Sequence, residues 1–289
     1  MYVDTSPSDS SLSVGSLPRM DGHARVRFAA KDGATRLAEL DQGSPLRVLF
    51  PRVEPDEPPL AAVTTVSGGL VGGDSLAILV ALDAGAKAVA VGQAAEKVYR
   101  STGPDSTVDI ALDVAADGWL EWLPQETILF DGARLSRRTR IDADPHARVL
   151  AGECVVFGRL ARGEVMRHGF LRDGWEVRHK GRLMWADALL VEGDIIGTLD
   201  ASVGFGGARA YATAIYTGAD ASDYLEAAKE LTRNVDGVRA GATCVHGVLV
   251  ARWLSTDPLA LRKSFETYWK EMRRAAGGLP ARLPRLWYV

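Results

Sequence analysis

The sequence predicts a mainly β protein, a large structure of stacked antiparallel β-sheets with about two α-helices near the C-terminus. Three observations predict this class. Between Gly22 and Gly207, short apolar segments follow one another roughly every 8–12 residues, and turn-forming residues separate them. Amphipathic helical periodicity occurs only after about residue 218. Because the first part does not alternate strands with long helices, a parallel nucleotide-binding sheet is disfavoured.

The clearest predicted strand covers residues 107–114, "TVDIALDV", where apolar side chains alternate with polar ones. Residues 75–82 and 86–92 are also predicted strands, and Gly85 between them can form a tight turn, which predicts a hairpin. The run Arg134 to Arg140, "RLSRRTR", alternates as well. We interpret it as a strand with a solvated charged face and not as a nucleic-acid site.

Two helices are predicted in a C-terminal helical part of about residues 218–278. The first covers residues 220–235, with Asp220 or Ser222 as N-cap. Its apolar stripe consists of Tyr224, Ala228, Leu231 and Val235.

The second helix begins after Asp257, a capping residue, with Pro258 in its first turn, and Gly277 is the predicted stop. Its apolar face consists of Leu261, Phe265, Tyr268 and Met272. A strand is predicted over residues 243–255, between the helices. The terminal "LPARLPRLWYV" is predicted to be an extended apolar tail docked on the protein.

Composition narrows the class of protein. The 289 residues carry a net charge of −3, so nucleic acid and anionic membrane surfaces are not expected partners. With only two cysteines and no apolar run near the ~18 residues of a membrane span, we expect a cytoplasmic protein. Serine-rich residues 1–20 are predicted to be a disordered tail, and residues 21–289 a single β-rich domain.

Residues 68–75, "GGLVGGDS", have the spacing of a phosphate-binding loop but carry Asp74 in place of the lysine. A carboxylate ~4 Å from a phosphate oxygen would be repelled by about 1 kcal/mol even in water. The residues that follow favour a strand and not a helix. We therefore interpret the stretch as a strand, a glycine turn and a strand. Asp74 either binds the N–H groups of its own turn or serves as a transient cation ligand.

The histidines and cysteines give no regularly spaced metal motif. His168 and His179 could meet across a hairpin. Cys244 and His246 lie on one face of a predicted strand and could bind a borderline ion, although a buried free cysteine is the commoner explanation.

Five segments, in this order, resemble the urease accessory protein family UreD, also called UreH. They are residues 68–74 (GGLVGGD), 93–101 (QAAEKVYRS), 121–133 (EWLPQETILFDGA), 154–159 (CVVFGR) and 283–289 (LPRLWYV). Two departures occur: Ser67 stands where the family often has proline, and Glu96 where serine is common.

The resemblance implies a β-rich, non-enzymatic metallochaperone scaffold of the cytoplasm. Such a protein acts with UreF and the GTPase UreG on apo-urease and guides nickel through a polar interior passage. Nickel would then be cargo in transit, and no cofactor would be bound stably. Carboxylates suit such a relay, because oxygen ligands hold nickel loosely.

The resemblance implies that eleven residues contact a partner or line the passage. They are Asp74, Lys97, Tyr99, Arg100, Ser101, Glu121, Gln125, Glu126, Asp131, Glu153 and Asp187. The transient nickel ligands implied are Asp74, Glu153 and Asp187.

Alternatives remain open for single residues and for the function. Lys97 and Arg100 could instead pair with Glu121 and Glu126 across strands. Trp119 and Trp122 are predicted on opposite faces of one strand. The second functional hypothesis is an enzyme that binds a small anion or nucleotide at residues 68–75. A third is an interaction module that binds through the two C-terminal helices.

Overall fold

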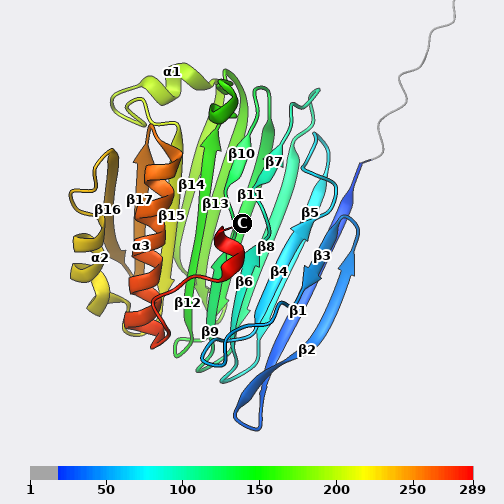
Figure 1. Ribbon diagram of the computed structural model, residues 1–289, viewed down its shortest axis with the longest axis vertical. Coiled ribbons are helices and arrows are strands. Elements are labelled where there is room, and N and C mark those ends of the chain that lie inside the picture. Colours follow the sequence, from blue (N-terminus) through cyan, green and yellow to red (C-terminus); the bar gives the residue numbers. More distant parts are fainter. Residues whose placement is uncertain (1–18, 289) are drawn as a thin grey trace, which may run out of the picture.

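The computed structural model describes residues 19–288, and within them the strands form two sheets that pack face to face (Figure 1). We name the sheet of seven strands sheet A and the sheet of ten strands sheet B. The predicted class, mainly β with stacked sheets and helices near the C-terminus, is confirmed. The predicted N-terminal tail lies outside the described residues as far as residue 18.

The strands of sheet A are, in spatial order, β14 (Arg182–Asp194), β13 (His168–His179), β11 (Arg134–Ala143), β8 (Ser106–Val114), β5 (Ser75–Leu82), β1 (Asp21–Lys31) and β2 (Ala34–Gly43). Those of sheet B are β16 (Val238–Val245), β17 (Val248–Ser255), β15 (Ala210–Thr217), β12 (Arg148–Phe157), β9 (Trp119–Leu123), β6 (Lys87–Gly92), β4 (Leu60–Thr65) and β3 (Leu46–Leu49), with short β10 (Thr127–Leu129) joining β12 to β7 (Glu96–Val98).

The strand orientation is mixed and not purely antiparallel. In sheet A, β1, β5, β8, β11 and β13 are parallel to one another, and in sheet B so are β4, β6, β9 and β12. The reason is that the chain alternates between sheets: β4 is in sheet B, β5 in sheet A and β6 in sheet B. A strand that returns to its own sheet after such an excursion runs in the same direction as before.

The predicted hairpin over residues 75–92 is therefore wrong. Its two segments are strands, but β5 pairs within sheet A and β6 within sheet B. Gly85 does adopt a left-handed φ of 72°, which serves the turn from one sheet to the other.

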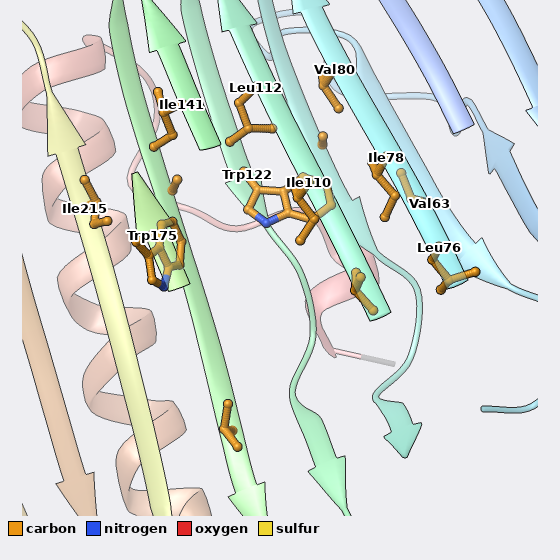
Figure 2. Close-up of a cluster of buried hydrophobic side chains, with 14 of the residues drawn as sticks. Val63, Leu76, Ile78, Val80, Ile110, Leu112, Trp122, Ile141, Trp175 and Ile215 are labelled. Atoms are coloured by element: carbon orange, nitrogen blue, oxygen red, sulfur yellow. The ribbon is translucent and has the colours of Figure 1, made fainter. Parts of the chain in front are cut away.

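An apolar core fills the space between the sheets (Figure 2). As the alternation of residues 107–114 predicts, Ile110 and Leu112 are buried there while Asp109 is exposed. The predicted opposite orientation of Trp119 and Trp122 is confirmed, because Trp122 packs between the sheets and Trp119 on the outer face of sheet B.

Helix α3 (Pro258–Gly277) covers the outer face of sheet B, where it lies along β15 and β17 (Figure 1). Asp257 caps it as predicted, by accepting a hydrogen bond from the Leu259 N–H at 2.8 Å. The predicted stop, Gly277, is the last residue of the helix, and the left-handed cap is the next residue, Gly278, with a φ of 63°. Gly277 is required for packing, since a Cβ there would lie 2.6 Å from the ring of Trp119.

The remaining C-terminal elements differ in part from the predictions. The first helix consists of η2 (Ala221–Tyr224) and the short α2 (Leu225–Thr232), and Asp220 does not cap it. Residues 243–255 form part of a β16–β17 hairpin that turns at His246, and not one strand. Two further short helices, η1 (Leu160–Arg162) and α1 (Ile195–Asp200), were not predicted.

The C-terminal tail is docked as predicted, but its last residues form a short helix and are not extended; Arg273 of α3 holds it. Trp287 in η3 (Arg285–Tyr288) is buried on sheet B. The guanidinium of Arg273 is fully buried and pairs with the carboxylates of Glu121 (3.1 Å) and Glu57 (2.7 Å). It also donates to the carbonyls of Pro280 (2.9 Å) and Arg282, so one side chain joins the strand, the helix and the tail.

We expect Arg273→Met to lower the free energy of unfolding by about 3–5 kcal/mol, because Glu121 would remain buried without its cation. The neighbouring Arg274 is exposed, and among the described residues it pairs only with Glu271 along the helix surface, so Arg274→Met should change the free energy of unfolding by less than about 0.5 kcal/mol. Urea unfolding measures both. Equal stabilities of the two variants would contradict the assignment.

Candidate functional site

The glycine turn before β5 is built around the carboxylate of Asp74. This side chain is 1% exposed and accepts hydrogen bonds from the backbone N–H of Val71 at 2.8 Å and of Met20 at 3.0 Å. A strand follows the turn, so no helix N-terminus faces it. A Cβ on Gly72 would come within 2.6 Å of the Pro104 carbonyl, so the turn packs against another loop. Asp74 thus binds the Val71 N–H of its own turn and ties the turn to Met20, which precedes β1.

The residues of the "KVYRS" motif lie beside this turn. The hydroxyl of Tyr99 donates to the carbonyl of Gly68 at 3.0 Å, and Lys97 accepts a backbone hydrogen bond from Leu70 at 2.7 Å. The hydroxyl of Ser101 donates to a nearby carbonyl in the 101–104 loop at 2.5 Å. Within residues 19–288 the exposed Lys97 side chain forms no ion pair. The glycine motif (residues 68–74) and the motif of residues 93–101 thus lie side by side.

The guanidinium of Arg100 pairs with the carboxylate of Asp131 at 3.1 Å. This carboxylate also accepts hydrogen bonds from the backbone N–H groups of Arg167 and His168. Burial opposes ionisation of Asp131, but these hydrogen bonds and Arg100 outweigh it and lower the pKa of the carboxyl. The alternative that Arg100 pairs with Glu121 or Glu126 is not what the structure shows, because those carboxylates pair with Arg273 and Arg262. His168 and His179 do not meet either, since they occupy opposite ends of β13.

Glu121, Gln125 and Glu126 tie the C-terminal segment to sheet B. Glu121 binds Arg273 and accepts from the indoles of Trp119 and Trp269. Gln125 donates to the Leu286 carbonyl at 2.7 Å, and Glu126 pairs with Arg262. Of the three, only Gln125 also lines the space between the sheets.

A cavity of about 80 Å³ lies between the sheets, enough for a few water molecules. Its walls are mainly apolar, from strands of both sheets. Gln93 and Ala94, both exposed, mark its outer end. Its polar lining consists of Thr65, Gln93, Glu96, Gln125, Thr127, Arg137 and Glu153. Glu96 accepts from the Thr65 hydroxyl at 2.6 Å, and burial raises the pKa of its carboxyl.

Glu153 lies at the inner end of this cavity as part of a buried charge cluster. Its carboxylate accepts from the guanidinium of Arg137 at 2.7 Å and from the indole of Trp122 at 3.1 Å. Arg137 also binds both oxygens of Asp173, at 2.7 and 3.0 Å. Burial raises the pKa of Glu153 to about 7, with Arg137 opposing the rise and Asp173 adding to it. All three charged side chains are at most 4% exposed.

Sequence reasoning missed Arg137 and Asp173. It assigned the 134–140 run a solvated charged face, which is correct for the exposed Arg138 and Arg140. Arg137, however, lies on the apolar face of β11 together with Leu135. The signal was its odd position in the alternation, one step out of phase with the exposed arginines.

Asp187 lies at the far edge of the inter-sheet space, where it pairs with Arg252 at 2.5 Å. This pair joins β14 of sheet A to β17 of sheet B, and Arg252 is exposed. Strand register places Glu153, Thr213 and Arg252 in one row across β12, β15 and β17. The hydroxyl of buried Thr213 bonds that of Tyr211 at 2.5 Å.

These groups form what we call the interior polar band, which crosses the apolar core from the cavity to the Asp187 edge. It consists of Thr127, Arg137, Glu153, Asp173, Tyr211, Thr213, Asp187 and Arg252. Two further buried polar atoms on the inner face of sheet A, Thr139 Oγ1 and Trp175 Nε1, have no hydrogen-bond partner in the part of the chain that the structure describes. Figure 2 shows Trp175 in the core between the sheets.

Within residues 19–288, no group of three or more His, Cys, Asp or Glu side chains is placed so that it could hold a metal ion. Asp74 is occupied by its turn, whereas Glu153 and Asp187 lie at separate points of the interior polar band. Cys244 and His246 do not share a strand face, because His246 is in the turn. Burial raises the pKa of the half-buried Cys244 thiol.

Fold and interior together define a two-sheet β protein that encloses ionised side chains in its core and has a strand–turn–strand in place of a phosphate loop. No helix of the described residues is long and apolar enough to cross a membrane. The family described as UreD urease accessory protein matches residues 20–288.

Individual relatives agree with this match. A urease accessory protein UreD of Magnetococcus marinus is 45% identical over 289 residues, or 99% of this chain and 98% of that protein. Another of the same name from Azorhizobium caulinodans is 40% identical over 270 residues, or 93% of this chain and 96% of that protein. The chain therefore belongs to the UreD family of urease accessory proteins.

If Asp74 serves its own turn, Asp74→Asn should lower the free energy of unfolding by about 1–3 kcal/mol, because an amide N–H₂ would face a buried N–H. Asp83→Asn is the control, since within residues 19–288 the Asp83 side chain forms only a half-exposed pair with Arg27, at the other end of β5. Thermal unfolding measures both variants. An Asp74→Asn protein as stable as the control would show that the carboxylate has another role.

Proposed function

We propose that this protein is a non-enzymatic metallochaperone scaffold for urease, and that nickel crosses it along the interior polar band. The observation that carries the proposal is the band itself, which continues through an otherwise apolar core from the cavity to an exposed edge. Ionised groups are rare in such a core unless they serve a purpose, because removing a charge from water costs several kcal/mol in effect.

The chemistry of the band suits transit and not storage. Its anionic groups are carboxylates, Glu153, Asp173 and Asp187, and each pairs with an arginine. Oxygen ligands hold nickel less firmly than imidazole or thiolate, so an ion can enter and leave. Glu96 and Gln125 line the cavity at one end of this path. On this proposal Glu153 and Asp187 are transient ligands, and no cofactor is bound stably.

In the proposed role the partners are UreF, UreG and apo-urease, and the compartment is the cytoplasm. GTP hydrolysis is assigned to UreG, which agrees with a glycine turn that carries the buried carboxylate of Asp74, bound to the Val71 N–H. Residues near Arg100 and Asp131, at the end of the molecule beside that turn, are proposed to contact a partner. An open cavity lined by Tyr99, Arg100, Asp131 and Arg167 supports this assignment.

An enzyme acting on a small anion or nucleotide at residues 68–75 is the second candidate. Asp74 argues against it, because its carboxylate would repel the ligand and already occupies the Val71 N–H of the turn. Titration with GTP, ATP and phosphate decides between the two. Micromolar binding that is lost on Gly72→Ala would favour the enzyme.

The scaffold role predicts that urease co-expressed with its other accessory proteins at limiting nickel gains activity only when this chain is present. A variant with both Glu153→Gln and Asp187→Asn should reduce that activity about tenfold or more, as loss of metal-handling groups commonly does. Glutamine at position 153 keeps an oxygen that can accept from Arg137, Arg137 stays paired with Asp173, and Arg252 is exposed, so folding should be retained.

The matched control is the surface variant Asp41→Asn. Within the described residues, it loses an exposed contact with His23. Pull-down of the accessory complex shows whether assembly is intact. Urease that is fully active at limiting nickel without this chain would refute the scaffold role. Full activation by the double variant would refute only the path through the band.

A further inference from the structure

The guanidinium of Arg137 occupies the position of a cation between two buried carboxylates. It pairs with Glu153 of sheet B at 2.7 Å and with Asp173 of sheet A at 2.7 Å. Thr127 adds a hydroxyl oxygen at 2.9 Å. Two carboxylates and one hydroxyl oxygen, all nearly inaccessible to solvent, form the kind of oxygen-rich setting that suits a divalent ion.

Arg137 is attached to its two acidic partners unequally. Asp173 binds it through two parallel hydrogen bonds, from Nε and Nη2, which is the stronger, bidentate geometry. Glu153 accepts only one, from Nη1, and its second oxygen accepts from Trp122 instead. Glu153 is therefore the carboxylate that Arg137 can release while it remains bound to Asp173.

The cavity lies on the side of the cluster where that release would occur. Arg137 and Glu153 line it, whereas Asp173 does not. Of the two carboxylates that bind Arg137, a cation in the cavity would therefore meet Glu153 and not Asp173. Thr139 follows Arg137 on the same face of β11, is 0% exposed, and its hydroxyl has no partner within residues 19–288. It supplies an unused oxygen beside the cluster.

We propose that Arg137 is an internal counter-ion that competes with a divalent cation for Glu153 and thereby keeps the interior position weak. This inference rests on the proposed nickel path and names the residue that prevents retention there. An entering ion takes the Glu153 contact from Arg137, which stays bound to Asp173. The returning guanidinium then displaces the ion. Arg137 acts through Glu153, so it is a positioning residue.

A purely structural Arg137 would behave differently. It would neutralise two buried carboxylates and stabilise the fold, and its removal would destabilise the protein without strengthening metal binding. The two roles are separated by the nickel affinity of the full-length chain, measured in the absence of urease.

The test uses the double variant Arg137→Met/Asp173→Asn, which keeps the net charge of the cluster because one cation and one anion are removed together. Competition with a chromophoric chelator gives the dissociation constant for nickel. We expect it to be at least about tenfold lower than in the unsubstituted chain, a range typical of changes around a metal ligand. Adding Glu153→Gln should abolish the gain.

Arg138→Met is the matched control, because Arg138 is next in sequence but exposed, and it pairs with Asp109 on the outer face of sheet A. It should leave the nickel affinity unchanged. If the double variant does not fold, as judged by circular dichroism, Arg137→Lys provides the test. Its ammonium cannot form the bidentate pair, so we expect a smaller but measurable gain in affinity.

Nickel affinity that is no higher in a folded Arg137 variant than in the unsubstituted chain would overturn the inference. Failure of the proposed function looks different: urease would mature without this chain, whatever the affinities are. If both proposals hold, the Arg137 variant should lower urease activation at limiting nickel while more nickel stays bound to the accessory complex, measured by elemental analysis.

Discussion

The structure depends on keeping ionised groups in a core that excludes water. Arg137, Glu153 and Asp173 satisfy this constraint only as a set, since each is nearly inaccessible to solvent. Breaking a buried pair by removing one partner typically costs about 3–5 kcal/mol. The cluster therefore fixes the relative positions of β11, β12 and β13, and it joins sheet A to sheet B through charge as well as apolar packing.

The alternation of the chain between the sheets is what brings this set together. Strands β11 and β12 are consecutive but lie in opposite sheets, so Arg137 and Glu153 face each other across the core. Strand alternation then separates two polar clusters on sheet B. On β9, Trp122 points inward and donates to Glu153, whereas its neighbour Glu121 points outward and binds Arg273 under α3. The inner cluster lines the cavity, and the outer one holds the C-terminal tail.

Periodicity in the sequence predicted the strands, the stacked class and the α3 helix with its Asp257 cap, because these depend on local chemistry. It could not predict which strands pair. The same alternating pattern suits a hairpin and a crossing between sheets, so β5 and β6 were assigned to each other. Errors in the site have the same origin: the partners of Arg100 and the burial of Arg137 depend on which sheet each strand joins. Asp74 differs, since its turn-binding alternative was visible in the sequence alone.

A path for a divalent ion through a protein core must lower the desolvation cost of the ion without creating a deep minimum that traps it. Free carboxylates would do the first but not the second, and they would also destabilise the core when the path is empty. Carboxylates already paired with arginine avoid both problems. In the proposed role, Glu153 exchanges its contact with Arg137 for one with the entering ion, so its charge is compensated in both states. In the proposed role, the same pairing that makes the empty core stable is therefore what makes the loaded state brief.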